Sequence, residues 1–201
     1  MSHPALLALA LLAAPQGIAP ALAEGESVEV ELRADFNADG IADLAYVARG
    51  EEMRELRVVT SRAGAGTNPA QVLALEAWPL VPATLEAKGA VLLFEDLNGG
   101  TTAIASTHRF RWDAKLGAMR LIGLDAMLYS RTFAHDGSEA SWNLLTGDLV
   151  TRRMRLRQDG GDQAYDIVGT KRRKKRSPPL RLEDAPGGDA LLGWPGEGGR
   201  I

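Results

Sequence analysis

Apolar and polar residues alternate along most of the chain, a pattern typical of strands that bury one face. In residues 26–35, for example, Val28, Val30 and Leu32 alternate with charged residues. The residues expected to face the core in the next two strands are Leu44, Tyr46, Ala48, Leu56 and Val58. Further strands are predicted over residues 90–97, 101–112, 118–131, 139–146, 149–158 and 163–175. Residues 72–78 fit a strand or a short helix, and residues 80–89 read as irregular.

Turn residues separate these segments, and no long segment after residue 23 carries a helical stripe of apolar residues. Short strands joined by glycine- and asparagine-containing turns predict an all-β fold, mainly an antiparallel meander or a sandwich-like arrangement. We expect one β-rich domain over residues 24–176 and a flexible tail, rich in proline and glycine, over residues 177–201.

The N-terminal residues 1–23 resemble a targeting segment rather than part of the fold. Residues 5–14 form an unbroken apolar run, which is too short to span a bilayer but suits the core of a helical signal peptide. Residues 21–23, Ala-Leu-Ala, provide a cleavage site, so we expect export to the periplasm or beyond after cleavage near Ala23. The alternative is a buried N-terminal helix, which Pro15 and Pro20 would interrupt. No later stretch is expected to span a membrane as a helix.

Composition narrows the possible chemistry. The chain has 201 residues, 45% of them hydrophobic, which is enough for a domain with a sizeable core. It has no cysteine, which excludes disulfides, zinc–thiolate sites and thiol nucleophiles. The formal charge is −8 over residues 1–150 and +8 over residues 151–181, so an acidic body precedes a basic band.

The segment from Asp35 to Asp43 is the most informative motif. Oxygen-bearing side chains occupy alternate positions at Asp35, Asn37 and Asp39, then Gly40 permits a sharp turn, and Asp43 follows. Calcium takes six to eight oxygen ligands, and alternating side chains let several oxygens converge while the chain wraps around the ion. The sequence therefore predicts a Ca²⁺ loop, and the alternative is a polar turn in which the Asx side chains bind their own backbone.

An EF-hand is excluded because position 12 of the loop is Tyr46 rather than glutamate, and because the flanking segments are strands. The pattern D-x-N-x-D-G-x-x-D between strands instead resembles the calcium loops of the FG-GAP/VCBS repeat family, found in integrin-like β-propellers and exported bacterial proteins. The resemblance covers about residues 26–60. It implies, as metal ligands, Asp35, Asn37, Asp39, the carbonyl of Ile41 and Asp43. Ala38 stands where the family commonly has glycine. Without a bidentate glutamate, we expect an affinity on the order of 10⁻⁴ to 10⁻³ M.

A second stretch repeats only the start of this motif. Asp96 and Asn98 have the D-x-N spacing, but Gly99 and Gly100 follow and too few oxygens remain, so we interpret it as a glycine hairpin. One complete motif cannot build a propeller, which needs at least about four blades. Residues 101–157 faintly resemble exported bacterial proteins that pair one such loop with a β-meander. Tyr129 and Trp142 could stack on a sugar or peptide, although core packing is the commoner role.

No catalytic motif stands out. His108 lies in an alternating strand and His135 in a turn, and neither G-x-S-x-G nor a phosphate-binding glycine loop is present. We therefore do not expect an enzyme. A hydrolase whose residues converge only in the fold is an alternative, which a concave pocket gathering His108 would favour.

The basic run is the other distinctive feature. In an exported protein this run could bind anionic envelope surfaces, whereas nucleic acid is not an expected partner. The other interpretation is that these charges protect an exposed edge strand from pairing with other chains. The members of the run are Lys171, Arg172, Arg173, Lys174, Lys175 and Arg176. We favour the edge-strand interpretation. The leading hypothesis is an exported calcium-binding β-domain with a structural role or an envelope or extracellular partner. The alternatives are a periplasmic hydrolase and a protein that binds anionic surfaces.

Overall fold

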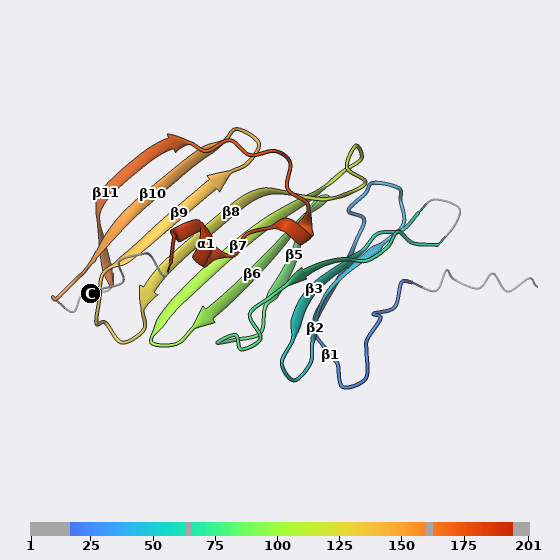
Figure 1. Cartoon of the computed structure of the whole chain (residues 1–201), viewed down its shortest axis with the longest axis horizontal. Helices are drawn as coiled ribbons and strands as arrows, with labels where there is room; N and C mark the ends of the chain where they lie inside the picture. The colour runs from blue at the N-terminus through green and yellow to red at the C-terminus, as the bar shows by residue number, and fades with distance from the viewer. Residues whose placement is uncertain (1–16, 63–65, 160–162, 195–201) are drawn as a thin grey trace, which may run out of the picture.

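The computed structural model, described here for residues 17–62, 66–159 and 163–194, contains two antiparallel sheets that do not close into a barrel (Figure 1). The smaller sheet contains β1 (Ser27–Ala34), β2 (Asp43–Arg49), β3 (Arg54–Val59) and β4 (Gln71–Ala74) in chain order. The larger contains β5 (Thr84–Lys88), β6 (Val91–Gly99), β7 (Thr102–Asp113), β8 (Ala118–Ser130), β9 (Gly137–Asn143), β10 (Asp148–Leu156) and β11 (Tyr165–Lys174). Each strand pairs with its sequence neighbour, which confirms the predicted all-β antiparallel meander.

Strand β2 is buried on both faces. Ala45 and Val47 belong to the main core shared by the two sheets, together with Leu56 and Val58 of the next strand. Leu44, Tyr46, Ala48 and Val59 form a second cluster on the opposite face, against Ile18 and Val28. The predicted burial of Leu44, Tyr46 and Ala48 is confirmed, but they face this second cluster rather than the main core. An apolar run buried on both sides does not reveal by alternation which face meets the larger core.

Strand β5 replaces the irregular segment expected over residues 80–89. It pairs with β6 and forms one edge of the larger sheet, opposite the edge formed by β11. Leu85 and Ala87 pack against the main core while their neighbours face solvent. Five residues of alternation following Pro79 and Pro82 are too short a signal to separate a strand from a loop.

The segment after Ser177 crosses one face of the larger sheet (Figure 1). It contains a 3₁₀ turn, η1 (Leu182–Asp184), and a short helix, α1 (Gly188–Leu192). Leu182 is fully buried and Leu191 is 9% exposed, both within the main core. Residues 177–194 thus pack on the sheet, which differs from the flexible tail expected over 177–201. Residues 195–201 lie outside the described part of the chain.

Three buried charged side chains join the two sheets. The Arg54 guanidinium donates to both carboxylate oxygens of Glu29 at 2.8 and 2.7 Å and to Asp96 Oδ1 at 2.9 Å. Glu29 lies on β1, Arg54 on β3 and Asp96 on β6, and none of these side chains is more than 4% exposed. Glu29 also accepts a hydrogen bond of 2.6 Å from the backbone N–H of Ala83, just before β5.

Residues 17–23 lie against the outer cluster of the smaller sheet. The Tyr46 hydroxyl donates to the Ala21 carbonyl at 3.0 Å, the Arg57 guanidinium donates to the same carbonyl at 2.8 Å, and Ile18 packs on the cluster. The apolar run at residues 5–14 lies outside the described residues. Among those that are described, no helix is long and apolar enough to cross a membrane.

Candidate functional site

The polar loop between β1 and β2 turns sharply at two residues in the left-handed region. Ala38 has φ 60° and Gly40 has φ 83°. Glycine adopts this conformation without the steric cost that a Cβ imposes, which explains Gly40, whereas Ala38 bears that cost. This path brings the side chain of Asp35 back over the loop, where it accepts hydrogen bonds from the backbone N–H groups of Asp39 at 3.2 Å and Gly40 at 2.9 Å.

Asp43 anchors the far end of the loop and is fully buried. Its Oδ2 accepts hydrogen bonds from the backbone N–H groups of Phe36 at 2.7 Å and Asn37 at 3.2 Å. Its Oδ1 accepts from the backbone N–H of Ser61 at 2.6 Å and lies 2.9 Å from the Ser61 hydroxyl. Asp43 therefore holds the loop to the segment that follows β3.

The hydroxyl of Ser61 lies among four oxygen atoms. It is 3.0 and 2.9 Å from the two carboxylate oxygens of Asp39, 2.9 Å from Asp43 Oδ1 and 3.5 Å from the Ile41 carbonyl. A hydroxyl has one proton to donate, so it cannot satisfy all four. Burial alone would raise the pKa of Asp39, but hydrogen bonds from the Ile41 N–H and the Ser61 hydroxyl outweigh it and lower that pKa.

The predicted ligands are thus only partly gathered. Asp39, Asp43 and the Ile41 carbonyl meet at Ser61, whereas Asp35 is directed to backbone N–H groups. Asn37 donates to the Ser61 carbonyl at 2.8 Å and to Asp39 at 3.3 Å. In the part of the chain that the structure describes, no group of three or more histidine, cysteine or acidic residues is placed to hold a metal ion.

Ser61 is absent from the predicted site because it lies far from the motif in sequence. The β2–β3 hairpin brings it there: Leu44 pairs with Val59, which places Asp43 beside the residues that follow β3. Ser61 could have been identified from the register of this hairpin, but not from a local sequence motif.

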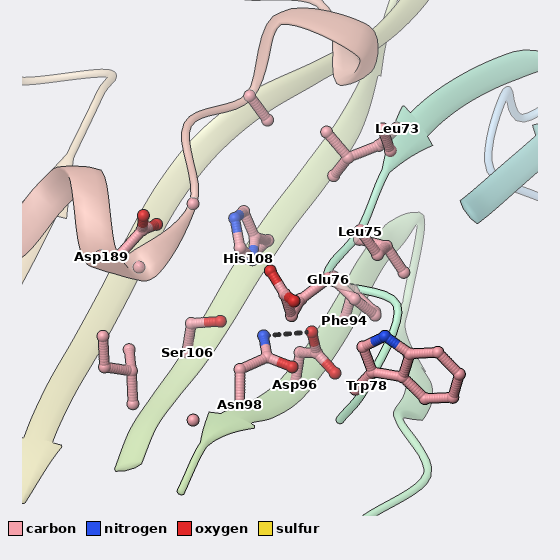
Figure 2. A pocket seen from close by; sticks show the side chains of 16 residues that line it. Leu73, Leu75, Glu76, Trp78, Phe94, Asp96, Asn98, Ser106, His108 and Asp189 are labelled. Atoms are coloured by element: carbon pink, nitrogen blue, oxygen red, sulfur yellow. Dashed lines mark hydrogen bonds between the residues drawn. The ribbon is translucent and has the colours of Figure 1, made fainter. Parts of the chain in front are cut away.

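The second D-x-N stretch forms the end of β6 and the turn into β7. Gly99 has φ 103°, and a Cβ there would lie 2.3 Å from the Thr102 carbonyl oxygen, so only glycine fits. Asp96 and Asn98 point from β6 into a separate cavity, where the Asn98 amide donates to Asp96 Oδ2 at 2.8 Å (Figure 2).

That cavity has a volume of about 490 Å³, within the range of small-molecule sites. It lies between β6, β7, the chain that leaves β4 and the C-terminal segment. Its walls combine aliphatic and aromatic side chains with carboxylate, amide, hydroxyl and imidazole groups. The side chains shown in Figure 2 with labels are Leu73, Leu75, Glu76, Trp78, Phe94, Asp96, Asn98, Ser106, His108 and Asp189.

His108 lines this cavity and is only 4% exposed. Its Nε2 lies 2.9 Å from the carbonyl oxygen of Pro186, so Nε2 carries a proton and donates it. Burial lowers the pKa of His108, although the Pro186 carbonyl and the charge of Asp96 partly oppose this, so the ring is neutral at pH 7. Its Nδ1 is then an acceptor, and it has no hydrogen-bond partner.

Ser106, His108 and Asp96 share the cavity but are not linked as a catalytic triad. Asp96 accepts from Arg54 and Asn98, and no hydrogen bond joins His108 to Ser106 or to Asp96. A Ser–His–Asp site requires the base to hydrogen-bond both the nucleophile and the carboxylate. A concave pocket that gathers His108 is the feature named above as favouring the hydrolase alternative, and this cavity has that feature.

The basic run lies at the edge of the larger sheet, on β11 and just beyond it. Lys174 pairs with Asp148 at 2.7 Å, and the Lys175 ammonium lies 4.2 Å from the centroid of the Trp142 ring. Trp142 is 4% exposed and donates to the Lys175 carbonyl at 2.8 Å, so this aromatic residue packs in the core and is not free to stack on a ligand. The anionic partner stays a prediction.

No family model matches the chain, and neither the curated proteins nor the solved structures searched include a similar one. The resemblance to FG-GAP/VCBS calcium loops over about residues 26–60 stays an expectation from the sequence.

Proposed function

We propose that this protein is an exported calcium-binding β-domain, in which the loop at residues 35–43 holds Ca²⁺ in a structural or partner-binding role. The observation that carries the proposal is the crowding of oxygen atoms around the Ser61 hydroxyl. Two carboxylates and one carbonyl lie within 3.5 Å of a group that has a single proton.

Calcium suits this arrangement chemically. A divalent cation near Asp39 and Asp43 would offset two like charges that here share one hydroxyl proton. An ionised carboxylate has about four lone-pair sites, and hydrogen bonds from backbone N–H groups fill only some of these sites on each carboxylate. The Ile41 carbonyl and the side-chain oxygen of Asn37 add neutral ligands of the kind that calcium takes. Asp35, which here accepts from the backbone N–H groups of Asp39 and Gly40, would be the further ligand.

Thermal unfolding of the purified protein in EDTA and in millimolar calcium tests the proposal. At a calcium concentration of about ten times the dissociation constant, linkage predicts about 1.4 kcal/mol of added stability. For a protein of this size, that corresponds to a rise in the unfolding midpoint of about 3–6 °C. Magnesium should give a smaller shift because it dehydrates reluctantly and requires stricter octahedral geometry.

Two variants sharpen the experiment. Asp39→Ala should abolish the calcium-dependent shift, whereas Asp148→Ala, a matched change of an exposed aspartate at the start of β10, should leave it intact. Ser61→Ala removes the only hydroxyl in the oxygen cluster, so the protein should be less stable in EDTA and should gain more from calcium. If several millimolar calcium leaves the unfolding midpoint unchanged in the unaltered protein and in all three variants, the loop is a polar turn and not a calcium site.

Export rests on the apolar run at residues 5–14 and the Ala-Leu-Ala sequence before Glu24. Cleavage after Ala23 would remove the contacts of Tyr46 and Arg57 with the Ala21 carbonyl. The mass of the protein isolated from the cell envelope tests this directly. A chain beginning at Glu24 supports the proposal, and an intact N-terminus in a cytoplasmic fraction contradicts it.

Hydrolysis is a second candidate because one cavity contains Ser106, His108 and Asp96. Covalent labelling by a fluorophosphonate, lost in Ser106→Ala and retained in Ser130→Ala, would support it. The hydrogen bonds of these residues favour binding over catalysis, since His108 Nε2 is bonded to Pro186 and Nδ1 contacts no hydroxyl.

A further inference from the structure

Two residues that line the cavity between the two sheets each have a buried acceptor atom without a hydrogen-bond partner among the described residues. Three buried side-chain atoms without a partner occur in the described residues, and two of them, His108 Nδ1 and Asn98 Oδ1, belong to residues that line this cavity. An unsatisfied buried polar atom is destabilising because no hydrogen bond offsets the loss of its hydration. Two of them beside one cavity therefore indicate a group that enters it and completes their hydrogen bonds.

The identity of both free atoms is fixed by their neighbours. The Pro186 carbonyl can only accept, so His108 Nε2 carries a proton, and because burial lowers the pKa of His108, the ring is neutral and Nδ1 has the lone pair. The Asp96 carboxylate accepts from the Asn98 nitrogen, so the free Asn98 atom is the carbonyl oxygen. Both sites thus require a donor, and a ligand that offers only acceptors would leave them unsatisfied.

The charges around the cavity select the kind of donor. Glu76, Asp96 and Asp189 line it, and no lysine or arginine of the described residues does. Arg54 pairs with Asp96 and Glu29, and Arg49 lies 3.9 Å from Glu29, so this network is close to neutral and the exposed carboxylates of Glu76 and Asp189 set the charge of the cavity. The surrounding potential is therefore negative, which attracts cations and repels anions.

The remaining walls select the body of the ligand. Leu73, Leu75 and Phe94 provide an apolar surface, and the indole of Trp78, which is 62% exposed, lies at the rim (Figure 2). An aromatic face within about 6 Å of a cation contributes a cation–π interaction. Apolar walls with a few converging polar groups are the usual composition of a small-molecule site.

We propose that this cavity binds a small organic ammonium compound, a protonated amine attached to an apolar body. The ammonium N–H groups donate to the free acceptors of His108 and Asn98 and pair with Glu76, while the apolar body packs against Phe94 and Trp78. This site is independent of the calcium loop and requires no catalytic step.

Three probes with the same aromatic body and different head groups test the charge preference: phenethylamine, phenethyl alcohol and phenylacetate. Isothermal titration calorimetry at low ionic strength should show phenethylamine binding about tenfold or more tightly than the alcohol. Phenylacetate should not bind, and added salt should weaken the amine selectively. A fourth probe, glucose, tests whether hydroxyl donors alone suffice.

Variants at exposed positions locate the site without endangering the fold. Glu76→Gln should weaken phenethylamine severalfold and leave the alcohol unchanged, and Trp78→Ala should weaken both. The matched controls are Glu52→Gln and Phe133→Ala, which change exposed residues outside the cavity and should have no effect. In NMR spectra the Trp78 indole N–H, identified by its loss in Trp78→Ala, should shift on addition of the amine.

Five results would overturn the proposal. Equal affinity for amine and alcohol, or preferential binding of glucose, would define a site for neutral hydroxyl compounds. Tight binding of phenylacetate would contradict the inferred charge. Binding of no probe, or an equal loss in the control variants, would show that the cavity is not a site for organic ammonium compounds.

Discussion

The buried charge network of Arg54 offers the sharpest test of how the two sheets are held together. Replacing Arg54 with methionine keeps much of the side-chain volume but leaves Asp96 without a cation and Glu29 with only Arg49, which is 40% exposed and 3.9 Å away. Removing one partner of a buried ion pair typically costs about 3–5 kcal/mol. At about 2–4 °C for each kcal/mol in a chain of this size, the unfolding midpoint should fall by about 6–20 °C.

The pH dependence of this loss follows from the sign of the pKa changes. Burial alone would raise the pKa of Glu29, but hydrogen bonds from Arg54 and the Ala83 N–H outweigh it, so the folded pKa lies below the usual 4.5. Glu29 therefore stabilises the normal protein above pH 4.5, and this contribution is lost as the pH falls through the folded pKa. Without Arg54, burial dominates and protonation relieves the unpaired charge, so the difference between variant and normal protein should narrow as the pH falls.

Urea unfolding monitored by circular dichroism between pH 7 and pH 4 measures both effects. Arg152→Met is the matched control, since its pair with Glu139 is 40% and 30% exposed and should contribute no more than about 1 kcal/mol. Adding Glu29→Gln and Asp96→Asn to Arg54→Met should recover much of the lost stability. The reasoning is refuted if Arg54→Met destabilises no more than Arg152→Met, or if its deficit is independent of pH.

Two further predictions concern the face covered by the C-terminal segment. Because burial lowers the pKa of His108 below 6.5, the unfolded chain binds more protons, and stability should fall as the pH drops below 6.5. His108→Phe should flatten this slope in urea titrations, and an unchanged slope would contradict it. Gly188→Ala would place a Cβ 2.9 Å from the Ser106 Cβ, so we expect about 1–3 kcal/mol of destabilisation and faster proteolysis of residues 177–194. Gly100→Ala, with nothing within 4 Å, is its control, and equal effects of the two would refute the packing argument.

The strands were predictable because most of them bury one face, so that burial and sequence alternate together. β6 and β7 illustrate this, with Leu92, Phe94 and Phe110 in the core. The packing of the C-terminal segment on the sheet was not predictable from the sequence. Its many proline and glycine residues indicate a flexible tail, and its few apolar residues are too weak a signal to indicate otherwise. Leu182 and Leu191 become core residues only once the sheet beneath them exists. Local sequence does not contain that information.

The candidate sites show the same limit more clearly. The ligand pattern from Asp35 to Asp43 is local and could be identified, but Ser61 enters through the pairing of β2 with β3. The cavity gathers Glu76, Asn98, His108 and Asp189 from four separate segments. No spacing rule relates such residues, since their proximity depends on how the sheets and the C-terminal segment pack.

Strand β3 connects the two proposed sites and also separates them. It begins at Arg54, which reaches the cavity through Asp96, and it is followed closely by Ser61, which touches the calcium loop. Seven residues of extended chain place these positions about 20 Å apart. Perturbations at that separation usually add, so calcium should raise the unfolding midpoint of Arg54→Met as much as that of the normal protein. A calcium effect that depended on Arg54 would instead mean that β3 transmits strain between its ends, and the loop and the cavity would then have to be treated as one site.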